Sequence, residues 1–143
     1  MGKRLSVAVA AAVVAAMMLA GPVLAAPVVT LEATLTGEQE VPGPGDRNGR
    51  GDAKLIVNRA RVCYVLRSDN IKRPQAAHIH EGRRGVAGDI VVELRPPRNG
   101  FSSGCEKISR ALSRDLRNNP THYYVNVHNK RFPDGAIRGQ LHQ

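Results

Sequence analysis

Three histidines carry the clearest chemistry in this sequence. His78 and His80 flank Ile79 in the segment AAHIHEG, and His128 ends the segment YYVNVH. Successive side chains of a β-strand point to opposite faces, so the two histidines of the first segment share one face. If the second strand lies beside the first, three imidazoles meet; if it does not, the His-x-His pair is an ordinary polar strand surface. The spacing therefore predicts a candidate metal site at His78, His80 and His128.

The ligand types restrict the metal that such a site would hold. Neutral imidazoles without a sulfur ligand suit Cu(II) or Zn(II). Three protein ligands also leave one coordination position open, which distinguishes reactive sites from purely structural ones. Copper is therefore the first candidate cofactor and zinc the second, and the alternative is a protein without a cofactor.

Three further polar residues are candidates for a supporting role near these histidines. Glu81 follows the first pair and could orient an imidazole, although residues beside glycines are also common in turns. Asn126 could bond across strands and set their register. Arg138, in the segment AIRGQL, could attract small anions to the site or serve as a surface ion-pair partner.

The first 25 residues have the pattern of a secretory signal peptide. Lys3 and Arg4 precede an apolar run, and the small-residue sequence VLA ends at Ala25. Cleavage there leaves residues 26–143, the length of one ordinary domain. We therefore expect an exported protein, periplasmic or extracellular, without a membrane span after cleavage.

Cys63 and Cys105 are the two cysteines of the chain. In an exported protein an isolated pair is most simply a disulfide, and this one would join a strand to the loop that precedes a helix. The alternative is a pair of thiolate metal ligands. If the disulfide forms, a bound metal must take imidazole, carboxylate or backbone ligands.

The chain is strongly basic, with a formal net charge of +9. Nucleic acid is a common partner of basic proteins, but the chain has only three tyrosines, two phenylalanines and no tryptophan, and it shows no basic helix or stacking platform. We therefore expect no nucleic acid partner. An anionic cell-envelope or extracellular polymer is the candidate partner, and the alternative is that the arginines only keep the protein soluble.

Short β-rich segments separated by glycine, proline and asparagine indicate an all-β protein, an antiparallel sandwich or barrel. One exception is the segment 108–120, where Ile108, Leu112 and Leu116 have helical spacing and Ser109 is a plausible N-cap. The segments predicted to be strands are 29–35, 52–58, 61–68, 76–80, 89–94, 123–128 and 136–141.

Several of these segments together resemble the CHRD domain family, named after repeats in chordin. The resemblance rests on AAHIHEGRRGVAGDIVVEL (76–94) and NPTHYYVNVHNKRFPDGAIRGQL (119–141), with GEQEVP (37–42) similar to the opening strand. RVCYVLRS and SGC resemble exported bacterial members that carry a cysteine pair. The resemblance covers about residues 31–141. It implies a single domain over residues 26–143, an antiparallel Greek-key β-sandwich like those of immunoglobulins and superoxide dismutases, with one short α-helix, and it implies little about activity.

CHRD sandwiches are in turn similar to copper/zinc superoxide dismutases, which bind copper through a strand-borne His-x-His and a later strand-end histidine. This chain departs from that pattern because the loop after His80, EGRRGVAGD, contains no histidine for a zinc half-site. We therefore expect a binding or interaction module, with one copper or zinc ion as its candidate ligand, rather than an enzyme with catalytic residues. The alternative is a copper-only, superoxide-dismutase-like redox protein, a copper-dependent oxidoreductase.

Overall fold

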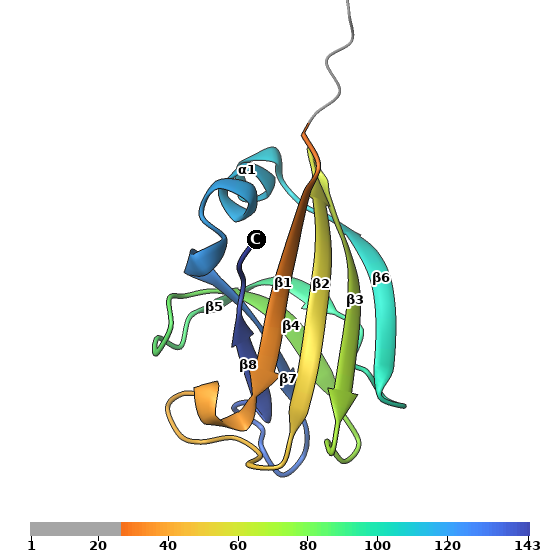
Figure 1. Cartoon of the computed structure of the whole chain (residues 1–143), viewed down its shortest axis with the longest axis vertical. Coiled ribbons are helices and arrows are strands. Elements are labelled where there is room, and N and C mark those ends of the chain that lie inside the picture. The colour runs from red at the N-terminus through yellow and green to blue at the C-terminus, as the bar shows by residue number, and fades with distance from the viewer. Residues whose placement is uncertain (1–26) are drawn as a thin grey trace, which may run out of the picture.

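The computed structural model describes residues 27–143 (Figure 1), so the predicted signal peptide, residues 1–25, lies outside the described residues. Eight antiparallel strands form one sheet in the order β5-β4-β7-β8-β1-β2-β3-β6. In chain order the elements are β1 (Val29–Thr36), η1 (Gly37–Gln39), β2 (Arg50–Asn58), β3 (Arg61–Asp69), β4 (Ala76–Glu81), β5 (Asp89–Leu94), β6 (Phe101–Lys107), α1 (Arg110–Asn118), η2 (Pro120–His122), β7 (Tyr123–His128) and β8 (Ile137–Gln140).

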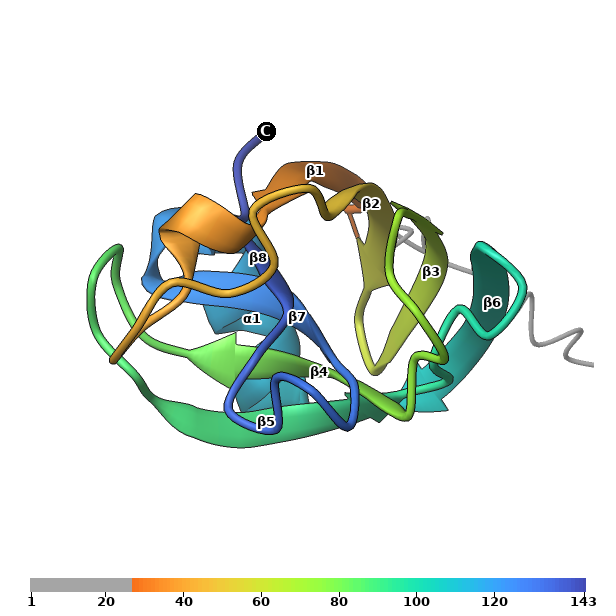
Figure 2. The same cartoon turned by 90° about the horizontal axis from the view of Figure 1, so that it is seen from below.

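The sheet folds on itself into two layers, β1–β2–β3–β6 and β5–β4–β7–β8, which are joined where β8 pairs with β1 (Figure 2). Strands β3 and β6 pair with each other, while β4 and β5, which lie between them in the chain, belong to the opposite layer. This is a Greek-key connection. The expected all-β Greek-key sandwich with one short helix is confirmed.

Period-2 alternation builds the core between the layers. Leu31, Leu35 and Leu55 face inward from one layer and are fully buried. In the opposite layer, Ala77 and Ile79 of β4 also face inward and are fully buried. Their neighbours in β4, the candidate histidines, therefore point to the outer face of the sandwich.

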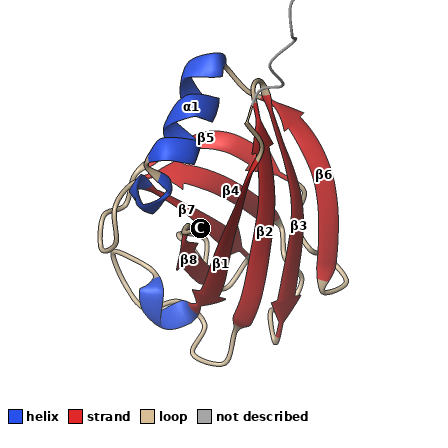
Figure 3. Cartoon of the chain, turned by 45° about the horizontal axis from the view of Figure 1, so that its top comes forward, coloured by secondary structure: helices blue, strands red, loops and turns tan. Residues whose placement is uncertain are grey.

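The predicted helix forms and lies at one end of the sandwich (Figure 3). Its N-cap is Ser109, whose hydroxyl accepts a hydrogen bond from the Leu112 N–H at 3.0 Å, as the sequence predicts. Leu116 is buried against the core and anchors the helix there. Among residues 27–143, no helix is both long enough and apolar enough to cross a membrane.

The disulfide between Cys63 and Cys105 is present, but its position differs from the prediction. Cys105 lies in β6 rather than in a loop, and the disulfide joins directly paired residues of β3 and β6. The sequence FSSGCEK has little β-propensity because of its glycine and serines. A larger residue at Gly104 would displace Tyr64, since a Cβ there would lie 2.7 Å from the hydroxyl oxygen of that buried side chain.

Candidate metal centre

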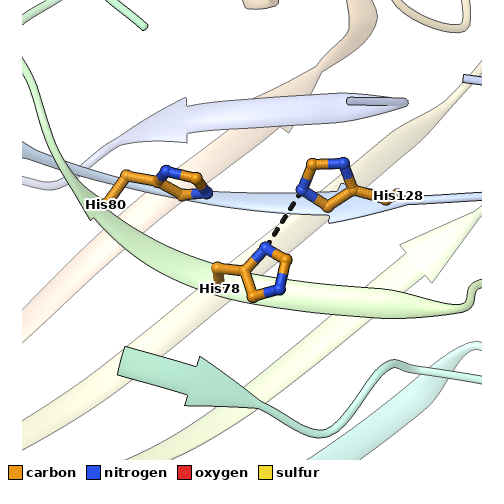
Figure 4. Close-up of side chains that lie close together, drawn as sticks. All are labelled: His78, His80 and His128. Atoms are coloured by element: carbon orange, nitrogen blue, oxygen red, sulfur yellow. Dashed lines mark hydrogen bonds between the residues drawn. The ribbon is translucent and has the colours of Figure 1, made fainter. Parts of the chain in front are cut away.

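The two histidine-bearing strands are neighbours, as the metal hypothesis requires. Strands β4 and β7 pair in antiparallel register, with His78 opposite Asn126 and Ala76 opposite His128. The side chains of His78, His80 and His128 converge on the outer face of this layer (Figure 4). One ring nitrogen from each lies within 4.8 Å of the other two. The structure thus brings the three candidate ligands together.

Backbone carbonyls determine which ring nitrogens of two histidines carry hydrogen. Nδ1 of His80 lies 2.8 Å from the Gly88 carbonyl oxygen, and Nδ1 of His128 lies 2.8 Å from the Pro133 carbonyl oxygen. A carbonyl only accepts, so each Nδ1 donates its N–H. In a neutral ring, each Nε2 is then left with a lone pair.

In His78 the roles of the two ring nitrogens are reversed, so that Nε2 carries the hydrogen. Its Nε2 lies 3.1 Å from a carboxylate oxygen of Glu93, and its Nδ1 lies 3.1 Å from Nε2 of His128. A carboxylate also only accepts, so Nε2 of His78 donates and Nδ1 retains the lone pair. The opposite tautomer would place a nitrogen lone pair against the carboxylate. When both rings are neutral, two lone pairs therefore face each other at 3.1 Å, an arrangement that a proton or a metal ion between them would stabilise.

The supporting residues differ partly from those predicted. Asn126 is 2 % exposed, and its side-chain amide lies 3.1 Å from Nε2 of His80, so it lies in the cluster. With the Nδ1–H tautomer of His80, this amide can bond to Nε2 only by donating its NH2 group. Glu81 is exposed, and as the next residue after His80 it faces the other side of the strand. Glu93 contacts the cluster instead, because the β4–β5 register places it opposite His78.

The chain matches the CHRD domain model over residues 31–141. It belongs to the CHRD domain family. No curated protein and no solved structure matches the chain. The similarity of this CHRD domain to copper/zinc superoxide dismutases therefore stays a prediction.

A stack of three side chains supports His80 in the CHRD domain. The guanidinium of Arg138 lies 3.4 Å from the centroid of the Tyr124 ring, and that ring stacks on His80 with centroids 4.7 Å apart and an interplanar angle of 6°. Arg138 is 1 % exposed and donates to the carbonyl oxygens of Arg83 and Val86, both at 2.9 Å. Arg138 therefore has a structural role, but as a buried donor to backbone carbonyls and not as the predicted surface ion-pair partner, since among residues 27–143 it forms no ion pair.

The same stack holds the loop that covers the site. The loop 82–88 joins β4 to β5, and Arg138 binds two of its carbonyl groups. The Gly88 N–H also donates to the Tyr124 hydroxyl at 3.2 Å, and the Gly88 carbonyl accepts from His80. Arg138 and Tyr124 therefore position the carbonyl that orients one candidate ligand.

Burial changes the protonation of the cluster. Desolvation lowers the pKa of His78, and the nearby Glu93 carboxylate only partly opposes this effect. Desolvation likewise lowers the pKa of His128, while its hydrogen bond to Pro133 acts in the opposite direction. Metal ions bind neutral imidazole, so burial keeps these two rings in the metal-binding form near neutral pH.

Proposed function

We propose that this CHRD domain is an exported binding protein that holds one copper or zinc ion through His78, His80 and His128. One observation carries the proposal: each ring has one nitrogen bonded to a carbonyl or carboxylate acceptor, and the second nitrogens of the three rings converge, with the Asn126 amide as a further contact of Nε2 of His80. Metal-binding histidines characteristically donate their second N–H to a carboxylate or a backbone carbonyl. Glu93, Gly88 and Pro133 supply such acceptors here.

The distances fit an ion after a small adjustment. A tetrahedral ion with metal–nitrogen bonds of about 2.0–2.1 Å separates its ligand nitrogens by about 3.4 Å. The pair formed by His78 and His128 is already near this value at 3.1 Å, and all three nitrogens lie within 4.8 Å of one another. Binding would therefore draw the most distant nitrogens together by up to about 1.4 Å and separate the His78–His128 pair slightly.

The chemistry of the donors supports copper or zinc and is compatible with export. Both cysteines are committed to a disulfide, so no thiolate competes with the imidazoles. Disulfides persist in oxidising compartments, which supports a periplasmic or extracellular location. Three nitrogen ligands leave one position for water or a substrate, and this feature favours a copper redox protein as the second candidate.

Calorimetric titration of the chelator-treated protein with Cu(II), and separately with Zn(II), tests the proposal. We expect one ion per chain in the wild type. His128→Ala should weaken binding at least about 100-fold, since it removes a ligand and not merely an outer contact. His142→Ala is the matched control, because His142 is exposed and lies outside the cluster, and it should bind as the wild type does.

Two results would overturn the metal hypothesis. One is the lack of stoichiometric binding by the wild type for either ion. The other is an equal loss in the His128 and His142 variants, which would indicate adventitious surface binding. Electron paramagnetic resonance of the Cu(II) form adds an independent readout, because nitrogen hyperfine splitting should indicate three imidazoles in the wild type and two in His128→Ala.

A further inference from the structure

A second polar site lies at the end of the sandwich opposite α1. Three loops meet there: the segment that precedes β2, the β3–β4 loop and the β7–β8 loop (Figure 1). Between them is a cavity of about 540 Å³, within the range of about 300–1,000 Å³ that is typical of small-molecule sites. We call it the loop cavity.

The charged lining of the loop cavity is predominantly basic. Lys72 and Arg73 come from the β3–β4 loop, Lys130 and Arg131 come from the β7–β8 loop, and Asp46 is the one carboxylate in the lining. All four basic residues are exposed. Within residues 27–143, none of the four forms an ion pair, and none of their side-chain nitrogens donates a hydrogen bond. Four cations thus surround a concave surface, and Arg131 also lies over the Phe132 ring, with its guanidinium carbon 5.3 Å from the ring centroid.

We infer that the loop cavity binds a segment of an acidic polysaccharide. Four cations at the rim of a cavity favour a ligand that carries several negative charges, since their fields add within a concave surface. The remaining lining is mainly amides, Asn48, Asn70 and Asn129. Asn70 donates to the Asn48 carbonyl and Asn129 accepts from two backbone N–H groups, so the Asn48 side chain is the amide best placed to bond to a sugar hydroxyl. The cavity volume accommodates a few sugar rings rather than a single small anion.

The lining argues against nucleic acid as the occupant. Proteins that bind single strands stack the bases on aromatic side chains. The loop cavity is lined by charged residues, amides and Ile71, without an aromatic side chain among the described residues. The inference is also independent of the metal proposal, because none of the three histidines lines the cavity.

The test is binding of a fluorescent polygalacturonate oligomer at several salt concentrations, with neutral dextran as the uncharged probe. The triple variant Lys72→Gln/Lys130→Gln/Arg131→Gln removes three of the four cations. It should weaken polygalacturonate binding at least about tenfold and lower the slope of log K against log salt by up to about three. Neither the wild type nor the variant should bind dextran.

A matched triple variant separates the site from the overall charge. Arg59→Gln/Arg61→Gln/Lys107→Gln removes the same charge from a second basic cavity, of about 630 Å³, at the α1 end. It should change the affinity less than about threefold. Equal losses in the two triple variants would overturn the inference and indicate attraction by net charge alone.

Two further outcomes decide the chemistry of the ligand. Single-stranded DNA of equal charge should bind more weakly than polygalacturonate; tighter binding of DNA would overturn the acidic-polysaccharide assignment. No binding of polygalacturonate by the wild type near physiological salt would overturn it as well. Circular dichroism and copper titration of each triple variant show that the fold and the histidine cluster are intact, so that lost binding reports on the cavity.

Discussion

The outer faces of the two layers of this CHRD domain follow the same alternation but have different environments. On the β1–β2–β3–β6 layer, outward residues reach solvent: Glu32 and Lys54 form an ion pair at 3.3 Å with both side chains 55 % exposed. On the β5–β4–β7–β8 layer, the outward residues His78, His80 and Arg138 are all buried. Outward-pointing polar residues are therefore solvent-exposed on the β1–β2–β3–β6 layer and buried on the β5–β4–β7–β8 layer.

The difference arises from the loops. The loop 82–88 and the β7–β8 loop lie over the second face and supply the carbonyl groups that accept hydrogen bonds from His80, His128 and Arg138. Burying polar groups is unfavourable unless each finds a partner. On the covered face one N–H of each histidine has an acceptor, whereas the converging lone pairs of the neutral rings do not have three donors. The metal proposal rests on this imbalance.

Among changes to the exposed face, removal of the disulfide should cause the largest loss in the free energy of unfolding. Replacing Cys63 and Cys105 by alanine should lower the free energy of unfolding by about 4 kcal/mol, because the closed loop spans a sequence separation of 42 residues. Urea denaturation measures this loss. Copper affinity should be unchanged in the folded variant, since the disulfide lies in the other layer. A marked fall in copper affinity would show that the two faces are not independent.

On the covered face, Arg138→Met should lower the free energy of unfolding by about 3 kcal/mol, because two charge-assisted hydrogen bonds and the stack on Tyr124 are lost. Arg67→Met is the matched control on the exposed face, where the Arg67–Asp52 pair is solvent-exposed and should contribute less than about 1 kcal/mol. Urea denaturation compares the two variants. Similar losses would contradict the contrast between the faces.

The alternation predicted which residues share a face, and the two histidine-bearing strands were identified correctly. It could not predict that loops cover one outer face, because burial of that face depends on tertiary contacts. Glu93 was missed for a related reason. Its position opposite His78 depends on the β4–β5 register, which includes an irregularity between Ile79 and His80. From the segment DIVVEL alone, one can predict that the Glu93 carboxylate faces outward but not that it lies opposite His78.

Strand β6 was missed because its sequence lacks a strand signal, and its pairing with β3 determines its conformation. The helix shows the opposite case. Its cap at Ser109 and its apolar spacing are local signals, and the structure confirms both. Local chemistry was therefore predictable in this chain, whereas strand register and loop cover were not.

Replacing the Glu93 carboxylate, which lies beside the histidine cluster, should have a smaller effect, and this effect should be on copper affinity. Glu93→Gln replaces the charged acceptor at Nε2 of His78 by a neutral one, and it should weaken copper binding about tenfold, the lower end for such a partner because the Glu93 side chain is 76 % exposed. Glu32→Gln on the exposed face makes the same charge change and should leave the affinity unchanged. Calorimetric titration of both variants measures the difference. Equal losses would mean that Glu93 acts only through net charge.

The smallest effect should be a pH dependence confined to the covered face. Burial lowers the pKa of His78 and of His128, so below about pH 6.5 the unfolded chain binds protons that the folded chain does not. Their contribution to stability is therefore complete above about pH 6.5 and is lost as the pH falls toward the lowered values. Urea denaturation of the chelator-treated protein between pH 8 and pH 5 should show a steeper decline in the wild type than in His78→Gln/His128→Gln. Parallel declines would show that protonation of these two rings does not cause the pH dependence of folding.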